Sequence, residues 1–423
     1  MKSVITCDME GRIETFNKGA EQMFGYSAEE VIGKERVSVF SPGEIVLQNV
    51  PKWLDEASKE GKHVSKTKFV RKDGTPFNAK IRITPTFANG KDKGQTGYCG
   101  VTEVIEEDVN PPIHFSTKLI KYLAIMRLPF ISAVLMPAFI GGAYAYHYLL
   151  SDPQVSFNWP IFLLTVLGVA LLHLGSNVMN DYFDVKDGTD GLNNDYFLQF
   201  SGGSRAIELG LISLEGTKRL GLALIAAATL IGVFLTAITG WPTLIIGLSG
   251  LAIGYLYTAP PVRLVARRGL GELGIALAFG PLVTGGVVYV LTQQIVPLAF
   301  LIGLPVGLLT ANILLINEFP DAASDAKTGK NHLVVTFGKE KSTFIYLAIL
   351  LAAFITNIGI VLLLPDTNPW LIGVSIASLL AGVFIFRHIR QHYKDRELVT
   401  SNKNTIALSA LTGLLTTIAL ILA

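Results

Sequence analysis

The chain has 423 residues, of which half are hydrophobic and only 16% are charged, and its formal net charge is +2. A soluble domain carries about 25% charged residues, and a charge this close to balance gives no reason to expect nucleic acid as a partner. About half of the charged residues, 16 Lys and Arg with 17 Asp and Glu, fall within residues 1–108. The composition therefore predicts a polar head followed by a membrane body.

The head begins with two strand-like runs, VITCD and RIETFN, joined by a turn. Asn17 suits the N-cap of a short helix, and Ser27 with Glu30 forms a capping box for the next one. Two alternating runs then flank a turn at 72–74, and a last strand lies in 94–108. This order, β-β-α-α-β-β-β, predicts a compact α/β domain.

Residues 109–127 form the expected junction between head and body. EEDVNPP reads as a short, stiff linker. Residues 114–127 carry Lys118, Lys121 and Arg127 among apolar residues, which predicts an interfacial helix at the membrane surface.

The body, 128–423, contains nine apolar segments long enough to cross a bilayer, which takes about 20 residues. Backbone groups in lipid must be hydrogen-bonded within the segment, so each is expected to be a helix. The segments lie at 128–150, 160–179, 219–239, 242–258, 273–292, 297–316, 343–364, 369–386 and 404–423.

Lys and Arg occur in every second gap between these segments, whereas 151–159, 240–241, 293–296 and 365–368 contain none. Positive loops face the cytoplasm. The N-terminus also lacks an apolar stretch of signal-peptide length. We therefore expect a multi-pass protein of the plasma (inner) membrane, with a cytoplasmic N-terminal domain and the C-terminus outside.

Two clusters of Asn and Asp follow the second and sixth apolar segments, and each repeats these residues at helical spacing. The residues that align are Asn177, Asn180, Asp181 and Asp184 in the first cluster, and Asn317, Asp321 and Asp325 in the second. Like charges one turn apart repel, and a bound cation removes that repulsion. Oxygen ligands without His or Cys favour Mg²⁺ over zinc.

Basic residues accompany both clusters: Arg205, Arg263, Lys327 and Lys330. Metal and Lys or Arg together stabilise the charge that develops on a departing diphosphate. An apolar interior can hold an isoprenoid tail and keep water from a carbocation. The pattern thus favours ionisation of an allylic diphosphate.

Several motifs over about 115–423 resemble the UbiA superfamily of intramembrane aromatic prenyltransferases. They are RLPF (127–130), NDYFDVKDGTD (180–190), SGGSRAIELGLIS (201–213), YTAPPVRLVARRGLGELG (257–274) and NEFPDAASDAKTGKNHLVV (317–335). The first cluster and NEFPD look most like the 1,4-dihydroxy-2-naphthoate prenyltransferases of menaquinone synthesis. Many relatives have Asp four residues after Asp184, where this chain has Gly188, so Asp187 and Asp190 both stay open as the residue that completes the metal site.

The resemblance implies an all-α bundle of nine transmembrane helices around a central cavity, with the two clusters facing each other across its opening. It implies Mg²⁺-dependent transfer of a polyprenyl group from its diphosphate to an aromatic acceptor within the lipid bilayer. The implied catalytic residues are Asn180, Asp184, Asp321 and Asp325. The implied metal site comprises these four with Asn177, Asp181 and Asp190. Arg205, Arg263, Lys327 and Lys330 are assigned to the diphosphate, and Tyr255 and Tyr257 to the cavity wall.

Within 1–108, FNKGAEQMFGYSAEEVIGK and VRKDGTPF resemble a PAS domain. The resemblance implies a cytoplasmic sensor that regulates the enzyme or a homodimer contact. The reactive Cys of flavin photosensors is missing from GKERVSVF (33–40).

Other functions remain open at this point. The acceptor is expected to be 1,4-dihydroxy-2-naphthoate, with 4-hydroxybenzoate or another quinone or lipid precursor as the alternative. A transporter is disfavoured because transporter sites lie near the membrane midplane, whereas the acidic clusters of this chain are expected at one membrane face. A receptor is disfavoured because no output module follows the ninth segment.

Overall fold

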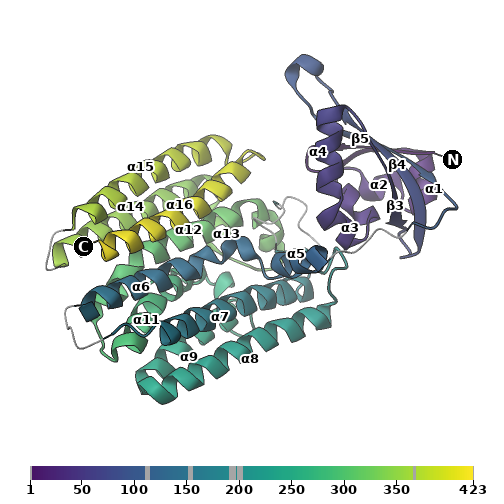
Figure 1. Cartoon of the computed structure of the whole chain (residues 1–423). Helices are drawn as coiled ribbons and strands as arrows, with labels where there is room; N and C mark the ends of the chain where they lie inside the picture. The colour runs from purple at the N-terminus through teal and green to yellow at the C-terminus, as the bar shows by residue number, and fades with distance from the viewer. Residues whose placement is uncertain are drawn as a thin grey trace. The chain divides into compact units, whose positions relative to one another are not determined.

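A computed structural model describes residues 2–109, 115–150, 156–189, 197, 203–364 and 368–422. The chain folds into two compact units (Figure 1). The head unit comprises Met1–Ile125 with Arg205–Ser213. The membrane unit comprises Met126–Ser204 with Leu214–Ala423.

The head unit contains one antiparallel five-stranded sheet, in the order β2-β1-β5-β4-β3. Its strands are β1 (Lys2–Asp8), β2 (Ile13–Phe16), β3 (His63–Val70), β4 (Pro76–Thr86) and β5 (Gly97–Val104). Aromatic side chains including Phe24, Phe40 and Phe69 fill the main core. The five strands that the sequence predicts are confirmed.

Between β2 and β3 lie α1 (Lys18–Phe24), α2 (Ala28–Val31), α3 (Gly43–Gln48) and α4 (Val50–Glu60). Asn17 caps α1 by accepting from the Ala20 amide, as predicted. The sequence reading did not include α3 and α4. Pro51 stands in the first turn of α4, where its fixed φ favours a helix start, and Trp53 and Ala57 of this helix are buried with Tyr98.

A further helix, α5 (Phe115–Ile125), covers most of the segment predicted to be interfacial. The membrane unit then consists almost wholly of helices. They are α6 (Ser132–Leu150), α7 (Trp159–Lys186), α8 (Leu214–Thr239), α9 (Trp241–Leu256), α10 (Leu270–Leu277), a π-helical turn η6 (Ala278–Leu282), α11 (Val283–Thr292), α12 (Pro297–Lys327), α13 (Leu333–Phe337), α14 (Lys339–Leu363), α15 (Pro369–His392) and α16 (Leu398–Ile421).

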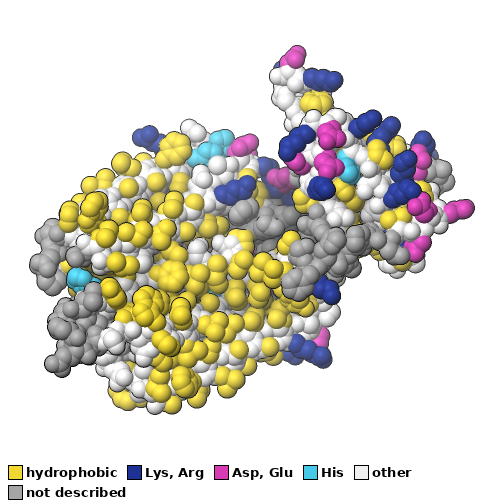
Figure 2. Space-filling view, in the orientation of Figure 1, with side chains coloured by type: hydrophobic (Ala, Val, Ile, Leu, Met, Phe, Trp, Pro, Cys, Tyr) yellow, Lys and Arg dark blue, Asp and Glu magenta, His cyan; other side chains and the backbone are white. Residues whose placement is uncertain are grey.

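Within the described ranges, eight helical stretches are long and apolar enough to cross a membrane, counting Leu270–Thr292 as one. The ninth predicted segment is also a helix, α9, but with 16 residues it is shorter than a usual span. Hydrophobic side chains cover the visible face of these helices (Figure 2).

Several helices run further than their apolar segments predict, and in two of them the extension carries the Asp-rich clusters. Helix α7 continues to Lys186 and α12 to Lys327, so both Asp-rich clusters lie on the last turns of long helices. Helix α12 is the most buried of the spans. It packs backbone to backbone against α10 and η6, because a Cβ on Gly307 would lie 2.1 Å from the Ala276 carbonyl oxygen of α10 and 2.9 Å from the Gly280 Cα of η6.

Candidate active site

Both Asp-rich clusters line one cavity of about 380 Å³ inside the membrane unit. Its polar end receives Asn177, Asn180 and Asp184 from α7. Helix α12 and the loop after it supply Asn317, Glu318, Asp321, Asp325, Lys330 and His332. The remaining walls are mostly aliphatic. A mainly apolar pocket with a few convergent polar groups is the usual form of a small-molecule site.

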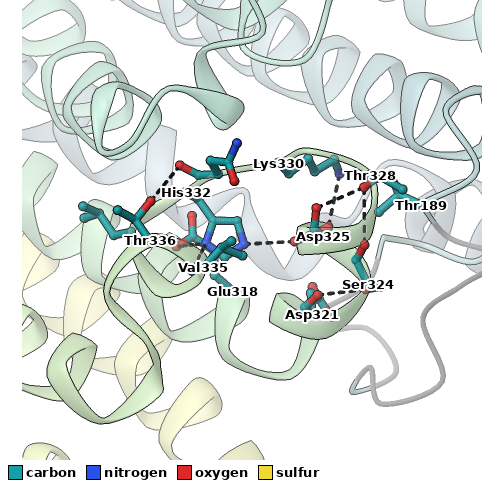
Figure 3. Close-up of polar contacts among 12 residues, drawn as sticks. Thr189, Glu318, Asp321, Ser324, Asp325, Thr328, Lys330, His332, Val335 and Thr336 are labelled. Carbon is teal, nitrogen blue, oxygen red and sulfur yellow. Dashed lines mark hydrogen bonds and ion pairs between the residues drawn. The ribbon is translucent and has the colours of Figure 1, made fainter.

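One lysine joins the two clusters. The buried Lys330 Nζ lies 2.6 Å from Asp184 Oδ1 and 3.7 Å from Asp325 Oδ1. Asn180 Nδ2 donates to the other Asp184 oxygen at 3.1 Å. A second link is the 3.1 Å hydrogen bond between the hydroxyls of Thr189 and Thr328 (Figure 3). The ends of α7 and α12 are thereby held together by a charged contact and a neutral one.

A histidine completes the second cluster. His332 is almost fully buried, with Nε2 3.1 Å from Asp325 Oδ2 and Nδ1 3.2 Å from Glu318 Oε2 (Figure 3). The Val335 amide also approaches Nδ1, but at the longer distance of 3.4 Å. Burial alone would lower the pKa of His332, but the two carboxylates outweigh it and raise the pKa to about 10. The imidazole is therefore a cation that partly balances these acids.

Arg127 brings a further cation to the cavity lining. Its Nη1 lies 3.9 Å from Asp181 Oδ1, and the Ser204 amide donates to the other Asp181 oxygen at 3.1 Å. Asp181 is buried behind the lining instead of facing the cavity. It therefore holds Arg127 and the loop at Ser204.

Of the other predicted site residues, some line the cavity and others lie outside it. Tyr257 lines the cavity, whereas Tyr255 does not: it is 38% exposed, with its ring 6.2 Å from that of Phe183. Arg205, in the head unit, pairs with Glu208 at 3.1 Å, and Arg263 pairs with Asp187 at 2.9 Å. Lys327 is exposed and outside the lining, and Asp190 falls outside the described residues.

The sequence patterns assign no place in the site to three polar residues that line the cavity, Arg127, Glu318 and His332. Each stands inside a motif that was recognised, RLPF, NEFPD and KNHLVV. The motifs therefore contained these residues. Helical spacing from the Asp residues could not place Arg127 or His332 in the site, because both come from neighbouring loops.

The side chains at the polar end of the cavity offer the type of ligand atom that Mg²⁺ prefers. Five of the side chains at the polar end, Asn177, Asn180, Asp184, Asp321 and Asp325, offer carboxylate or amide oxygens. Among the residues with described positions, no three His, Cys, Asp or Glu side chains are close enough to hold an ion by themselves. Mg²⁺ does not require this, because it keeps several waters and is commonly held by one or two carboxylates with substrate phosphates.

Comparison with known proteins identifies the class. The UbiA prenyltransferase family matches residues 134–411, and a PAS domain matches residues 2–106. The chain belongs to the UbiA prenyltransferase family. It is an integral membrane prenyltransferase with an N-terminal PAS domain.

Among its relatives is the 1,4-dihydroxy-2-naphthoate octaprenyltransferase of Bacillus subtilis, 26% identical over 69% of this chain and 89% of the relative. Another is the 2-carboxy-1,4-naphthoquinone phytyltransferase of Synechocystis sp., 29% identical over 67% and 86%. A solved UbiA homolog from Archaeoglobus fulgidus, bound to DMAPP and Mg²⁺, is 18% identical with a TM-score of 0.52. It covers 72% of this chain and 99% of its own. At this identity the likeness supports the fold.

Proposed function

We propose that this protein transfers a polyprenyl group from polyprenyl diphosphate to 1,4-dihydroxy-2-naphthoate, with Mg²⁺, in menaquinone biosynthesis. The names of several relatives support the acceptor. The observation that carries the proposal is the Lys330 contact, because it brings both Asp-rich clusters to one end of an apolar cavity. A diphosphate at that end leaves the cavity free for the tail.

At the polar end, Asp184, Asp321 and Asp325 would hold Mg²⁺ together with the oxygens of the bound diphosphate, with Asn177 and Asn180 as amide ligands. When bound, Mg²⁺ neutralises charge on the diphosphate and makes it a better leaving group. Lys330 and Arg127 contribute fixed positive charge beside the same oxygens. Such preorganised charge acts strongly because the surroundings exclude water.

The chemical step then follows from the cavity. The bond between the allylic carbon and the diphosphate oxygen breaks, and the electron pair leaves with the diphosphate. The apolar walls exclude water, and the Tyr257 ring can stabilise the allylic cation. The ring carbon that carries the carboxylate forms the new carbon–carbon bond, and CO₂ departs, which restores the aromatic ring.

The three-part organisation is proposed with the same boundaries as from the sequence: a PAS head at 1–108, a junction at 109–127 and the prenyltransferase body at 128–423. We place the head in the cytoplasm and the C-terminus on the other side of the plasma (inner) membrane. The PAS head is proposed to regulate the enzyme or join two copies. Removing 1–108 tests this, since an unchanged rate, response to redox state and oligomeric state would count against both roles.

The direct test uses purified protein with Mg²⁺, octaprenyl diphosphate and either 1,4-dihydroxy-2-naphthoate or 4-hydroxybenzoate. Release of diphosphate and of CO₂ only with the naphthoate supports the proposal. Turnover of 4-hydroxybenzoate alone would show that 4-hydroxybenzoate, and not the naphthoate, is the acceptor. Asp184→Asn and Asp321→Asn should each reduce turnover by about 100-fold or more, the scale of losing a charge-stabilising group. Near-normal turnover in folded variants would refute the assignment.

A further inference from the structure

A buried asparagine on the last helix contacts the cavity wall from behind. Asn402, on α16, is fully buried and is not among the described residues that line the cavity. Its Nδ2 donates to Asn317 Oδ1 at 2.7 Å and to the Ile316 carbonyl at 3.3 Å. Asn317 does line the cavity. Helix α16 therefore reaches the site through the side chain of Asn402.

The two contacts fix the orientation of both side-chain amides. A backbone carbonyl can only accept, so the Ile316 carbonyl requires the NH₂ end of Asn402. That NH₂ group in turn requires the oxygen end of Asn317. Because this oxygen is engaged behind the wall, the NH₂ group of Asn317 is the part left for the cavity. Asn317 is thus a hydrogen-bond donor to whatever the cavity holds, unlike the neighbouring Asp321.

Asn402 is held firmly, and its presence has a cost. On the same helix, Ser401 Oγ lies 2.8 Å from His388 Nδ1 of α15, and the Thr405 hydroxyl lies 2.9 Å from that of Tyr346 on α14. Asn402 Oδ1 is buried without a hydrogen-bond partner among the residues that the structure describes. An unsatisfied buried acceptor destabilises the fold, and a leucine would avoid this cost. Packing alone therefore does not explain an asparagine at this position.

Asn317 lies deeper in the cavity than the proposed metal site. Along α12, Asn317 is one turn from Asp321 and two turns from Asp325, which is about 6 Å and about 12 Å of helix. Lys330, which would neutralise the diphosphate, contacts Asp325 at the outer level. A donor at Asn317 therefore faces the part of the substrates beyond the diphosphate, where the allylic carbon and the acceptor ring meet.

We infer that Asn402 is a positioning residue, which holds the Asn317 amide so that it donates to the acceptor's hydroxyl oxygen beside the carboxylate. The inference rests on the proposed function and adds to it a pair of residues that orient the acceptor. That hydroxyl can donate its proton to the neighbouring carboxylate of the same molecule, so its oxygen is left to accept from the protein. The ring carbon that forms the new bond is next to this oxygen. Fixing the oxygen therefore directs that carbon toward the donor.

The first test is a double-mutant cycle with 1,4-dihydroxy-2-naphthoate and octaprenyl diphosphate. Asn317→Leu and Asn402→Leu should each lower kcat/KM for the naphthoate at least about tenfold, because a small misplacement of a substrate is costly. The KM for the octaprenyl donor should stay unchanged. Since Asn402 acts through Asn317, adding Asn402→Leu to Asn317→Leu should lower kcat/KM no further. Asn402→Ala, which removes the amide without adding bulk, replaces Asn402→Leu if that variant does not fold.

Asn357→Leu is the matched control. Asn357 of α14 is also buried and donates to Ser375 Oγ at 2.7 Å, but it does not line the cavity. Its kcat/KM for the naphthoate should equal the wild-type value. Unfolding temperatures in detergent separate any loss of stability, which the control should share, from the loss of kcat/KM, which it should not.

A competition experiment gives a readout that does not require catalysis of the probe. In wild type, 1-hydroxy-2-naphthoate should inhibit at a concentration at least about tenfold lower than 2-naphthoate, which lacks the hydroxyl. This ratio should approach one in Asn317→Leu and in Asn402→Leu, and it should stay at the wild-type value in Asn357→Leu. An unchanged ratio in Asn317→Leu would overturn the inference.

The possible outcomes are distinct. If wild type turns over no acceptor, the proposed function itself fails. If wild type is active but Asn402→Leu lowers kcat/KM equally with and without Asn317→Leu, Asn402 has only a structural role and the inference fails. Near-normal kcat/KM in Asn402→Leu would also overturn it. A raised KM for the octaprenyl donor, with that for the naphthoate unchanged, would show that Asn317 serves the diphosphate and not the acceptor.

Discussion

Lys330 Nζ lies 2.6 Å from Asp184 Oδ1, although the two residues are 146 positions apart in the chain. Both side chains are buried, and the same ammonium group lies 3.7 Å from Asp325. The contact therefore links two helix ends and balances charge in the cavity. Removing one of these buried charges destabilises the protein by more than the intact ion pairs stabilise it, because the remaining charges are left buried and unpaired.

Lys330→Met should consequently lower both stability and activity. We expect a loss of about 3–5 kcal/mol in stability, as for other broken buried ion pairs, and a fall in kcat of about 100-fold or more from the missing charge at the diphosphate. Thermal unfolding in detergent and a prenyl-transfer assay measure the two effects. Lys341→Met, at an exposed position outside the cavity, is the control. Equal behaviour of the two variants would contradict the role given to Lys330.

Removal of divalent cations should abolish transfer. The oxygen donors at the polar end favour Mg²⁺, and without a cation the facing carboxylates repel the diphosphate. Treatment with a chelator followed by gel filtration should reduce the rate to background, and added Mg²⁺ should restore it. Full activity after chelation, checked by metal analysis, would exclude the proposed metal site.

His332→Gln should destabilise the membrane unit, because Glu318 and Asp325 would lose the cation between them. The expected cost is about 3–5 kcal/mol. Adding Glu318→Gln should recover part of this loss, since the double variant has one fewer unpaired carboxylate. Unfolding curves of the two single variants and the double variant test this coupling. Simple additivity would show that His332 and Glu318 act independently.

Gly307→Val should disrupt the packing of α12 on α10 and η6. A Cβ at Gly307 would lie 2.1 Å from the Ala276 carbonyl and 2.9 Å from the Gly280 Cα, so backbone must move. Overpacking that shifts backbone typically costs about 1–3 kcal/mol and occasionally more. Gly359→Val in α14, where a Cβ has nothing within 4 Å, is the control. The yield of folded protein and the unfolding temperature should fall only in Gly307→Val.

The head offers a test with pH. Burial raises the pKa of the Cys7 thiol to about 12 from an ordinary value of 9.0. Above pH 9 the unfolded thiol ionises while the folded one stays protonated, so this contribution to stability is present below pH 9 and is lost as the pH approaches 12. The unfolding temperature of the head should therefore drop less between pH 8.5 and about 10 in Cys7→Ser than in wild type.

The prediction of the fold from sequence succeeded where patterns are local and strong. Apolar length gave the nine helical segments, and capping at Asn17 gave the first helix of the head. The ends of α7 and α12 were placed too early, since Asn and Asp lower the hydropathy although the helices continue. Helix α4 was missed because its few apolar residues are buried only by tertiary contacts with residues such as Tyr98.

For the candidate site, helical spacing grouped Asn177, Asn180 and Asp184 correctly on one side of α7. The same reasoning did not separate Asp181, which is one residue further on and points to Arg127 instead. Nor can spacing show that the loop after α12 folds back to bring Lys330 between two carboxylates. These contacts are fixed by long-range packing, so the sequence alone does not determine them.

The continuation of α7 to Lys186 and of α12 to Lys327 has one more consequence. The carboxylates of both clusters are carried by helical backbone and not by loose loops, so a donor that binds there has little chain left to order.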